Sequence, residues 1–359
     1  MKIQSKLKDY AAEMIDGLLD KREEVLANLK FNRLFYFVDS NVSRIYVGKL
    51  RQFISDDFCL LIEALETNKE YGNLANYYRA LIENNFTRND ILVTIGGGIL
   101  QDISGFISST LFRGVKWVFF PTTLLAQADS CIGSKTSINF DGSKNLIGSF
   151  CPPDAIFIDM SFCQTLTPEY FNSGLGEIIK FHLMSDESKY KLLREYLALP
   201  DLRHGEHFKT IIWSTLQIKK SYFAEDEFDT DRRNLLNYGH CFGHALESAG
   251  NFAVCHGEAV LIGMGFANLL SLKRGIMTED KYDEFEELFQ KYYPRFNLSK
   301  VNVESIISYL KHDKKRVGKD LTMILSKDIG KQFKFNDIKE KEIVEAYNDF
   351  IKIYPKNEG

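Results

Sequence analysis

Apolar positions along the chain follow two different patterns, one in each half. In the first half, short and nearly continuous apolar runs alternate with helical stretches such as Leu74–Glu83. Unbroken apolar runs are typical of parallel strands covered on both faces. Strands are therefore predicted at Leu34–Asp39, Phe58–Glu63, Ile91–Ile95, Trp117–Phe120 and Ala155–Asp159. Their alternation with helices predicts βαβ units and an α/β nucleotide-binding domain with a mostly parallel sheet over residues 1–160.

From about residue 161 onward the apolar positions recur at helical spacing. Helices are predicted at Pro168–Met184, Lys189–Ala198, Phe208–Ala224, Gly243–Ser248, Glu258–Arg274, Asp280–Tyr293 and Val303–Lys311. The strand-like pieces are Thr322–Leu325 and a hairpin partner at Gln332–Phe335. Residues 161–359 are therefore predicted to form a mostly α-helical second domain.

Composition narrows the class of protein. The chain has 359 residues, 45% hydrophobic and 26% charged, which is ordinary for a soluble protein of two domains. A net charge of −4 gives no reason to expect nucleic acid. The 6 cysteines include no CxxC pair, which favours reduced thiols and a cytoplasmic location. The N-terminus continues into what we expect to be a charged helical segment, with no signal peptide and no membrane-spanning run.

Three of the 7 histidines, His240, His244 and His256, fall in one short stretch. His240 and His244 are four residues apart and share a helix face, and convergent imidazoles are typical zinc ligands. Glu177, in Gly-Glu-Ile-Ile-Lys180, is expected to complete a site with His240 and His256 that leaves one coordination position open. The alternatives are ordinary core or surface histidines, and a surface ion pair between Glu177 and Lys180.

Glycines 96–98 follow a predicted strand and open a helical run ending at Asp102. Glycines there let a backbone approach a pyrophosphate, and the helix N-terminus supplies N–H groups. The spacing differs from GxGxxG, so an ordinary turn is the alternative. Asp39, at the end of an earlier strand, is a candidate for a ribose hydroxyl.

A polar, glycine-punctuated segment follows the strand at Trp117–Phe120. It carries Asp129, Lys135, Lys144 and Asn145, and its lysines indicate an anion pocket in a loop, with surface lysines as the alternative. Further basic and amide groups are Lys219, Arg233, Asn237 and Lys314. Arg233 is distinguished by its position one to two helical turns before His240.

With these pieces in order, the chain resembles the 3-dehydroquinate synthases, within the sugar phosphate cyclases. The likeness runs from about Asp39 to Ile329. It rests on the collinear motifs GGGILQD (96–102), PTTLLAQADS (121–130), GSKTSIN (133–139), SKNLIGSF (143–150), GEIIK (176–180), LNYGHCFGHALE (236–247) and HGEAVLIGM (256–264).

The resemblance implies roles for individual residues. Zinc or cobalt ligands would be Glu177, His240 and His256. NAD contacts would be Asp39, Asn41, Glu66, Lys69, Gly97, Gly98, Asp102, Thr122, Thr123 and Lys144. Substrate-pocket positions would be Asp129, Lys135, Lys144, Asn145, Lys180, Lys219, Arg233, Asn237, His244 and Lys314. Arg113 matches an arginine lent to the neighbouring subunit's phosphate pocket, which implies a homodimer.

The implied reaction converts 3-deoxy-arabino-heptulosonate 7-phosphate to 3-dehydroquinate and phosphate, a step of the shikimate pathway to aromatic amino acids. It combines transient oxidation by NAD, β-elimination of phosphate, reduction and an intramolecular aldol closure, with a metal polarising the oxidised oxygen. Lys219 and Arg233 fill the positions that bind the substrate carboxylate in this family. They favour the acidic substrate over sedoheptulose 7-phosphate or glucose 6-phosphate.

Some positions depart from the family pattern. Ser134, Ser143, Gly176 and Cys241 replace the usual Gly, Gly, Ala and Thr, Asp229 replaces Glu, and the first forty residues lack the usual opening strands. A cyclase of a secondary pathway is therefore an alternative. A metal-dependent polyol dehydrogenase and a non-catalytic paralogue are two others, although none of the three implied metal ligands has been lost.

Overall fold

The computed structural model describes residues 1–251, 253–311 and 320–354 of the chain. The chain divides into two compact units, Met1–Leu166 and Thr167–Gly359, whereas the sequence placed the division after residue 160. None of the described helices is both long and apolar enough to cross a membrane.

The first unit is built on a seven-stranded sheet in the order β1-β2-β9-β6-β5-β3-β4. Every neighbouring pair is parallel except β1 and β2, so the predicted mostly parallel α/β fold is confirmed. The strands are β1 (Lys2–Ile3), β2 (Tyr10–Met14), β3 (Leu34–Asp39), β4 (Phe58–Ile62), β5 (Ile91–Gly96), β6 (Lys116–Pro121) and β9 (Ala155–Ile158).

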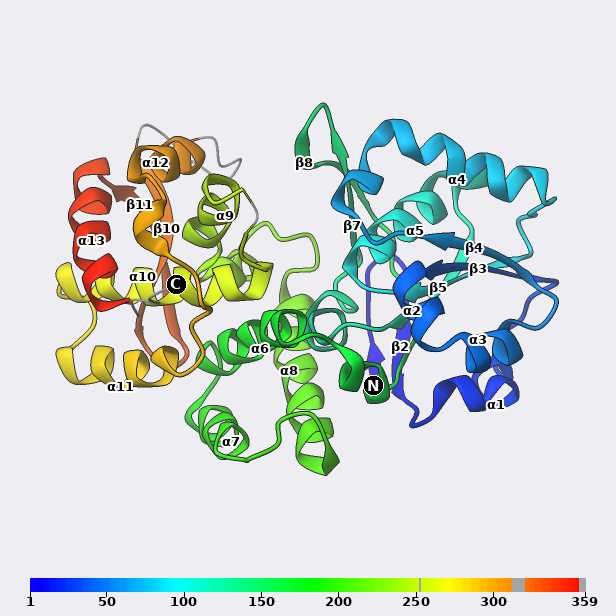
Figure 1. Cartoon of the computed structure of the whole chain (residues 1–359), viewed down its shortest axis with the longest axis horizontal. Helices are drawn as coiled ribbons and strands as arrows, with labels where there is room; N and C mark the ends of the chain where they lie inside the picture. Colours follow the sequence, from blue (N-terminus) through cyan, green and yellow to red (C-terminus); the bar gives the residue numbers. More distant parts are fainter. Residues whose placement is uncertain (252, 312–319, 355–359) are drawn as a thin grey trace. The chain divides into compact units, whose positions relative to one another are not determined.

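Helices cover both faces of this sheet, as Figure 1 shows. On one face, alternate strand residues such as Tyr36 and Val93 pack in one core cluster with α1 (Arg22–Leu26), α2 (Ser40–Ile45) and α3 (Val47–Ile54). The other face is covered by α4 (Tyr71–Glu83) and α5 (Gly98–Thr110), where the rings of Phe37 and Tyr77 lie 6.0 Å apart. Burial on both faces explains the continuous apolar runs of the sequence.

Two sequence-based expectations for this unit are wrong. The charged segment after Met1 is not helical, because β1 and β2 lie there and the backbone of β2 pairs with β9. The polar segment after β6 is not a loop: β7 (Lys135–Phe140) and β8 (Ser143–Phe150) form an antiparallel hairpin. These segments are strands because their backbones pair with other strands. Their own sequences lack the apolar pattern that would predict a strand.

Short helical turns link the longer elements. They are η1 (Leu18–Asp20), η2 (Glu66–Lys69), η3 (Leu111–Arg113), η4 (Ala126–Ser130), η5 (Met160–Thr165), η6 (Arg232–Asn237) and η7 (Leu298–Lys300).

The second unit is mostly helical, as predicted, and its helix α10 is its most buried element. Helices α6, α9, α11 and α13 and strand β10 all pack against α10. The helices are α6 (Pro168–Leu183), α7 (Glu187–Leu197), α8 (Gly205–Glu225), α9 (His240–Ala249), α10 (His256–Lys273), α11 (Glu279–Gln290), α12 (Val303–Lys311) and α13 (Glu340–Ile353). The predicted hairpin is present as β10 (Leu321–Asp328) and β11 (Lys331–Ile338).

Candidate functional site

Eight of the ten residues predicted to contact NAD lie at the carboxyl ends of four neighbouring strands. Thr122 and Thr123 follow β6, Gly97 and Gly98 follow β5, Asp39 and Asn41 end or follow β3, and Glu66 and Lys69 lie in η2 after β4. In open α/β sheets ligands bind along this edge. The sheet order therefore brings together residues that are distant in sequence.

Two features at this edge fit a phosphate-bearing ligand. Gly97 precedes α5, whose first N–H groups have no partner within the helix and can bind an anion. The hydroxyl of Thr122 is buried and makes no hydrogen bond within the described residues. One oxygen of Asp39 already has a structural role: Oδ1 accepts the backbone N–H of Asn41 at 2.7 Å and caps α2.

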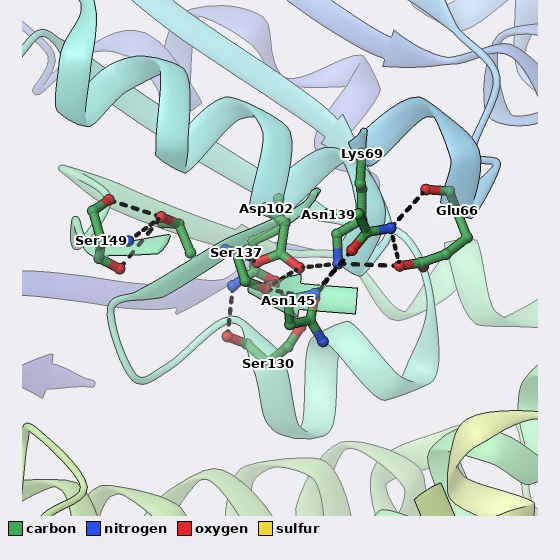
Figure 2. Close-up of polar contacts among 10 residues, drawn as sticks. Glu66, Lys69, Asp102, Ser130, Ser137, Asn139, Asn145 and Ser149 are labelled. Atoms are coloured by element: carbon green, nitrogen blue, oxygen red, sulfur yellow. Dashed lines mark hydrogen bonds and ion pairs between the residues drawn. The ribbon is translucent and has the colours of Figure 1, made fainter. Parts of the chain in front are cut away.

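A polar network joins several of the predicted NAD and substrate residues, and Lys69 is its hub (Figure 2). Lys69 Nζ lies 2.8 Å from Asp102 and 3.5 Å from Glu66, and it donates to Asn145 Oδ1 at 2.7 Å. Ser137 donates to Asp102 from both its N–H and its hydroxyl. Burial raises the pKa of Asp102, while the Lys69 ammonium and the Ser137 hydrogen bonds lower it.

The predicted anion pocket in the segment after β6 is divided by the hairpin. Lys135 begins β7 opposite Phe150, whereas Lys144 lies near the hairpin tip, next to the Phe140–Ser143 pair. Both lysines are exposed, and Asp129 is half-buried in η4. Within this unit Lys135 and Lys144 therefore lie at opposite ends of one hairpin.

The second unit brings Glu177, His240, His244 and His256 together. Glu177 and Lys180 lie on α6, His240 and His244 on α9, and His256 begins α10. Ring nitrogens of the three histidines lie within 4.8 Å of one another. Glu177 and Lys180 form an ion pair that is buried, so the alternative of a surface pair is wrong.

The spacing of these atoms fits a tetrahedral divalent metal. Glu177 Oε1 lies 3.4 Å from Nε2 of His240 and 3.4 Å from Nε2 of His256. Two ligands at zinc-bond length on a tetrahedral ion are about 3.4 Å apart. Both oxygens of Glu177 are buried and accept no hydrogen bond in the described part of the chain. Oε2 is paired with the Lys180 ammonium, so Oε1, which faces both imidazoles, is the oxygen placed to bind a metal ion.

The charges of the cluster are strongly coupled. Burial opposes ionisation of Glu177, but the Lys180 ammonium and the neighbouring His256 hold its pKa well below its usual range. Burial and the Lys180 ammonium hold the pKa of His240 well below normal, which keeps this imidazole neutral as a ligand must be. Burial alone would lower the pKa of His256, but the carboxylates of Glu177 and Glu247 raise it to about 10.

Two glycines let the helices that carry Glu177 and His256 approach closely. A Cβ on Gly176 would lie 2.1 Å from the carbonyl oxygen of Gly257, and one on Gly257 would lie 1.7 Å from that of Ser173. The N–H of Gly257 donates to Ser173 Oγ at 3.0 Å and fixes this contact. Gly176, a departure from the family pattern, thus lies where α6 and α10 are in backbone contact.

Lys219 and Arg233 are both buried in the second unit. The Arg233 guanidinium lies 5.4 Å from the ring centre of Phe223, one turn after Lys219 on α8. Burial opposes ionisation of Asp226, but hydrogen bonds from the backbone N–H groups of Thr230, Asp231 and Arg233 lower its pKa to about 2. These bonds hold the segment that carries Arg233.

The remaining predicted residues have varied settings. Asn237 ends η6 and donates to the carbonyl of Asn234 at 2.7 Å. His244 is exposed on α9, with its ring centre 5.2 Å from that of His240. Arg113 is exposed at the end of η3. Lys314 lies outside the described residues.

Sequence analysis missed three contacting residues. Asn139 donates to Glu66 Oε1 at 2.9 Å and accepts the N–H of Asn145, and Ser137 contacts Asp102 (Figure 2). Glu247 Oε2 lies 3.5 Å from His256 Nδ1. The spacing of Glu247, seven residues after His240, could have indicated it, since both then share a helix face.

Known proteins resemble this chain over most of its length. Family models of the N-terminal and C-terminal regions of 3-dehydroquinate synthase match residues 59–173 and 174–316. The chain is 35% identical to the 3-dehydroquinate synthase of Clostridium acetobutylicum, over 88% of each chain. This chain belongs to the 3-dehydroquinate synthase family. The family member of Streptococcus equi subsp. equi is 33% identical, over 90% of this chain and 91% of its own.

Solved structures place the fold among sugar phosphate cyclases. The 2-epi-5-epi-valiolone synthase of Streptomyces hygroscopicus subsp. jinggangensis, with NAD⁺ and Zn²⁺ bound, superposes with a TM-score of 0.84 at 26% identity, covering 97% of this chain and 99% of its own. A 2-deoxy-scyllo-inosose synthase complexed with carbaglucose-6-phosphate, NAD⁺ and Co²⁺ gives 0.86 at 24%, with the same coverage. The predicted family and fold are confirmed.

Proposed function

We propose that this protein is a 3-dehydroquinate synthase that converts 3-deoxy-arabino-heptulosonate 7-phosphate to 3-dehydroquinate and phosphate. The observation that carries the substrate assignment is the pair of buried cations in the second unit, Lys219 and Arg233. Both residues fill positions that bind the substrate carboxylate in the family, and the Arg233 guanidinium also donates to the carbonyl oxygen of Glu227. A guanidinium matches a carboxylate with two parallel hydrogen bonds, which favours an acidic sugar phosphate.

NAD and a divalent metal are the proposed cofactors. When bound, they would supply transient oxidation of a ring alcohol and polarisation of its oxygen. The residues described above fit both groups: the carboxyl ends of β3, β5 and β6 for NAD, and Glu177, His240 and His256 for zinc or cobalt. In this proposal Lys180 binds a substrate hydroxyl and His244, with Lys144 and Asn145, binds the phosphate.

The assignment is tested with purified protein, zinc and a catalytic amount of NAD⁺. The expected result is phosphate release from the heptulosonate phosphate, with 3-dehydroquinate as product and no net NADH. Turnover of sedoheptulose 7-phosphate or glucose 6-phosphate alone would instead assign the chain to another cyclase. Steady NADH formation with glycerol or another polyol would identify a dehydrogenase.

Arg233→Ala tests the carboxylate contact. Loss of a charged hydrogen-bond partner is expected to cost about 1.5–3 kcal/mol of substrate binding. Arg233→Lys keeps the charge but not the planar fork, so it is expected to recover part of that loss. Unchanged KM and kcat in Arg233→Ala would remove Arg233 from the substrate site.

We also propose that the protein is a homodimer in which Arg113 completes the phosphate pocket of the neighbouring subunit. Phe112 and Arg113 have positive φ values of 50° and 64°, and the side chain of Arg113 is exposed. Such backbone strain in non-glycine residues is concentrated at functional positions. Mixing inactive Arg113→Ala with inactive Glu177→Gln should restore activity in hybrid dimers, and no restoration would contradict the shared site.

A further inference from the structure

Both candidate histidine ligands have their Nδ1 atom beside an oxygen while their Nε2 atom is directed at Glu177. In His240, Nδ1 lies 3.2 Å from the carbonyl oxygen of Tyr238, and Nε2 lies 3.4 Å from Glu177 Oε1. In His256, Nδ1 lies 3.5 Å from Glu247 Oε2, and Nε2 again lies 3.4 Å from Glu177 Oε1. The two imidazoles are thus oriented in the same way by two different acceptors.

The two acceptors differ in kind. The carbonyl of Tyr238 belongs to a buried residue whose hydroxyl donates to Asn268 on α10, so its position is set by the fold. Glu247 is a side chain on α9, largely buried at 14% exposure, and it contacts His256 on the next helix. His240, His244 and Glu247 occupy positions i, i+4 and i+7 and share one face of α9. This helix therefore offers both a candidate ligand and the acceptor for a ligand on α10.

We propose that Glu247 is a positioning residue for the metal: it holds the ring of His256 with Nδ1–H toward its carboxylate and Nε2 toward the ion. A metal-bound histidine commonly donates its other ring N–H to a carboxylate, which fixes the ring orientation and tautomer. This inference rests on the proposed metal site. It adds a residue that touches neither metal nor substrate.

The test measures zinc affinity by competition with a chromophoric chelator in wild-type protein and in Glu247→Gln and Glu247→Ala. Removal of such an acceptor typically weakens metal binding by about 10–100-fold. We expect a loss in that range for Glu247→Ala and a smaller loss for Glu247→Gln, whose amide oxygen can still accept from Nδ1–H. Glu195→Gln, which alters an exposed ion pair with Lys191 on α7, is the matched control and should bind zinc normally.

A second readout is the absorption spectrum of the cobalt-substituted protein, which reports ligand geometry. The spectrum is expected to change in Glu247→Ala and to return toward wild type in Glu247→Gln. Wild-type zinc affinity and cobalt spectrum in both variants would overturn the proposal. If Glu247→Ala does not fold, Glu247→Gln alone decides, and wild-type affinity in it counts against the proposal.

The metal measurement separates this inference from the proposed function. Tight zinc binding that depends on Glu247, in a protein that turns over no heptulosonate phosphate, would refute the function and leave the positioning role standing. Failure of wild-type protein to bind zinc would overturn the metal site and this inference together.

Discussion

The two polar clusters of this protein differ in how their charged groups are partnered. In the first unit, Lys69 is surrounded by Asp102, Glu66 and Asn145, and its charge is balanced by side chains of the same unit. In the second unit, three imidazoles gather beside Glu177, whose Oε2 is paired with Lys180 and whose Oε1 faces His240 and His256. The ammonium of the first cluster is therefore surrounded by acceptors, whereas in the second cluster one carboxylate oxygen and three imidazoles converge as metal ligands do. Similar residue types thus form an ion-paired network among the predicted NAD and substrate residues in one unit and a candidate metal site in the other.

The largest expected effect is on metal binding. Glu177→Gln removes the carboxylate on which both imidazoles converge, and it should lower zinc affinity by more than about 100-fold, beyond the effect of losing an outer acceptor. Chelator competition measures the change. Asp102→Asn makes the same chemical change in the first unit and should leave zinc affinity unaltered. Equal losses of zinc affinity in Glu177→Gln and Asp102→Asn would show that the two clusters do not differ in metal binding.

A stability measurement examines the first cluster. Lys69→Met leaves Asp102 without its cation, and breaking a buried pair costs about 3–5 kcal/mol. The Asp102 side chain is 22% exposed, so the cost should fall at the low end of this range. We expect the free energy of unfolding to decrease by about 3 kcal/mol. Denaturant titration of the metal-free protein measures it.

Lys191→Met is the control for Lys69→Met. It removes an exposed pair with Glu195 and should cost less than about 0.5 kcal/mol. Equal costs for the two substitutions would mean that the Lys69 network does not stabilise the unit.

His182, which lies on α6 with Glu177, is a buried histidine whose two ring nitrogens both have partners within the chain. Its Nδ1 lies 2.8 Å from the carbonyl of Ile178 and its Nε2 lies 3.1 Å from Ser214 Oγ, and burial lowers its pKa to about 4. Since the unfolded chain binds this proton near pH 6.5, the neutral folded form is fully favoured above that pH. Stability is therefore lost as pH falls from about 6.5 to 4.

Between pH 7 and pH 5 the contribution of His182 amounts to about 2 kcal/mol. His182→Gln should lose correspondingly less stability over that interval than wild type does, as compared by denaturant titration at the two pH values. Parallel losses in the two proteins would show that His182 is protonated in the folded state.

The sequence predicted the elements whose own residues carry the signal. The apolar runs of β3, β5 and β6 and the helical periods of α6 and α8 are present as expected. Strand β2 was missed because it is short and carries Glu13, and its pairing partner β9 lies at the far end of the unit's sequence. Register and pairing arise from distant contacts, which local patterns do not encode.

The candidate sites likewise contain residues that a local pattern predicts and residues that only contacts between distant segments bring in. The spacing of His240 and His244 indicated a convergence that the structure contains. By contrast, the contact of Asn139 with Glu66 and that of Glu247 with His256 join different elements, and neither residue type is distinctive alone. Where Lys135 and Lys144 seemed neighbours in a loop, the hairpin register separates them.

The smallest expected effect concerns shape rather than charge, at the edge proposed for NAD. A Cβ on Gly97 would lie 2.9 Å from Thr123 Cγ2. Thr123 cannot turn this methyl group away without moving its Oγ1, which accepts the N–H of Ala126 at 3.1 Å. Gly97→Ala should therefore cost about 1 kcal/mol of stability through overpacking, measured by denaturant titration.

Thr123→Ser removes Cγ2 and keeps the hydroxyl, so the double variant Gly97→Ala/Thr123→Ser should regain most of the stability lost in Gly97→Ala. This recovery would locate the requirement for glycine in the contact with Thr123, because the φ of −89° at Gly97 is accessible to alanine. No recovery would place the cost elsewhere at the β5–α5 turn. Recovery would show that the stability of the first unit is sensitive to a single methyl group at the edge proposed for NAD, whereas the metal affinity expected of the second unit depends on a single charge.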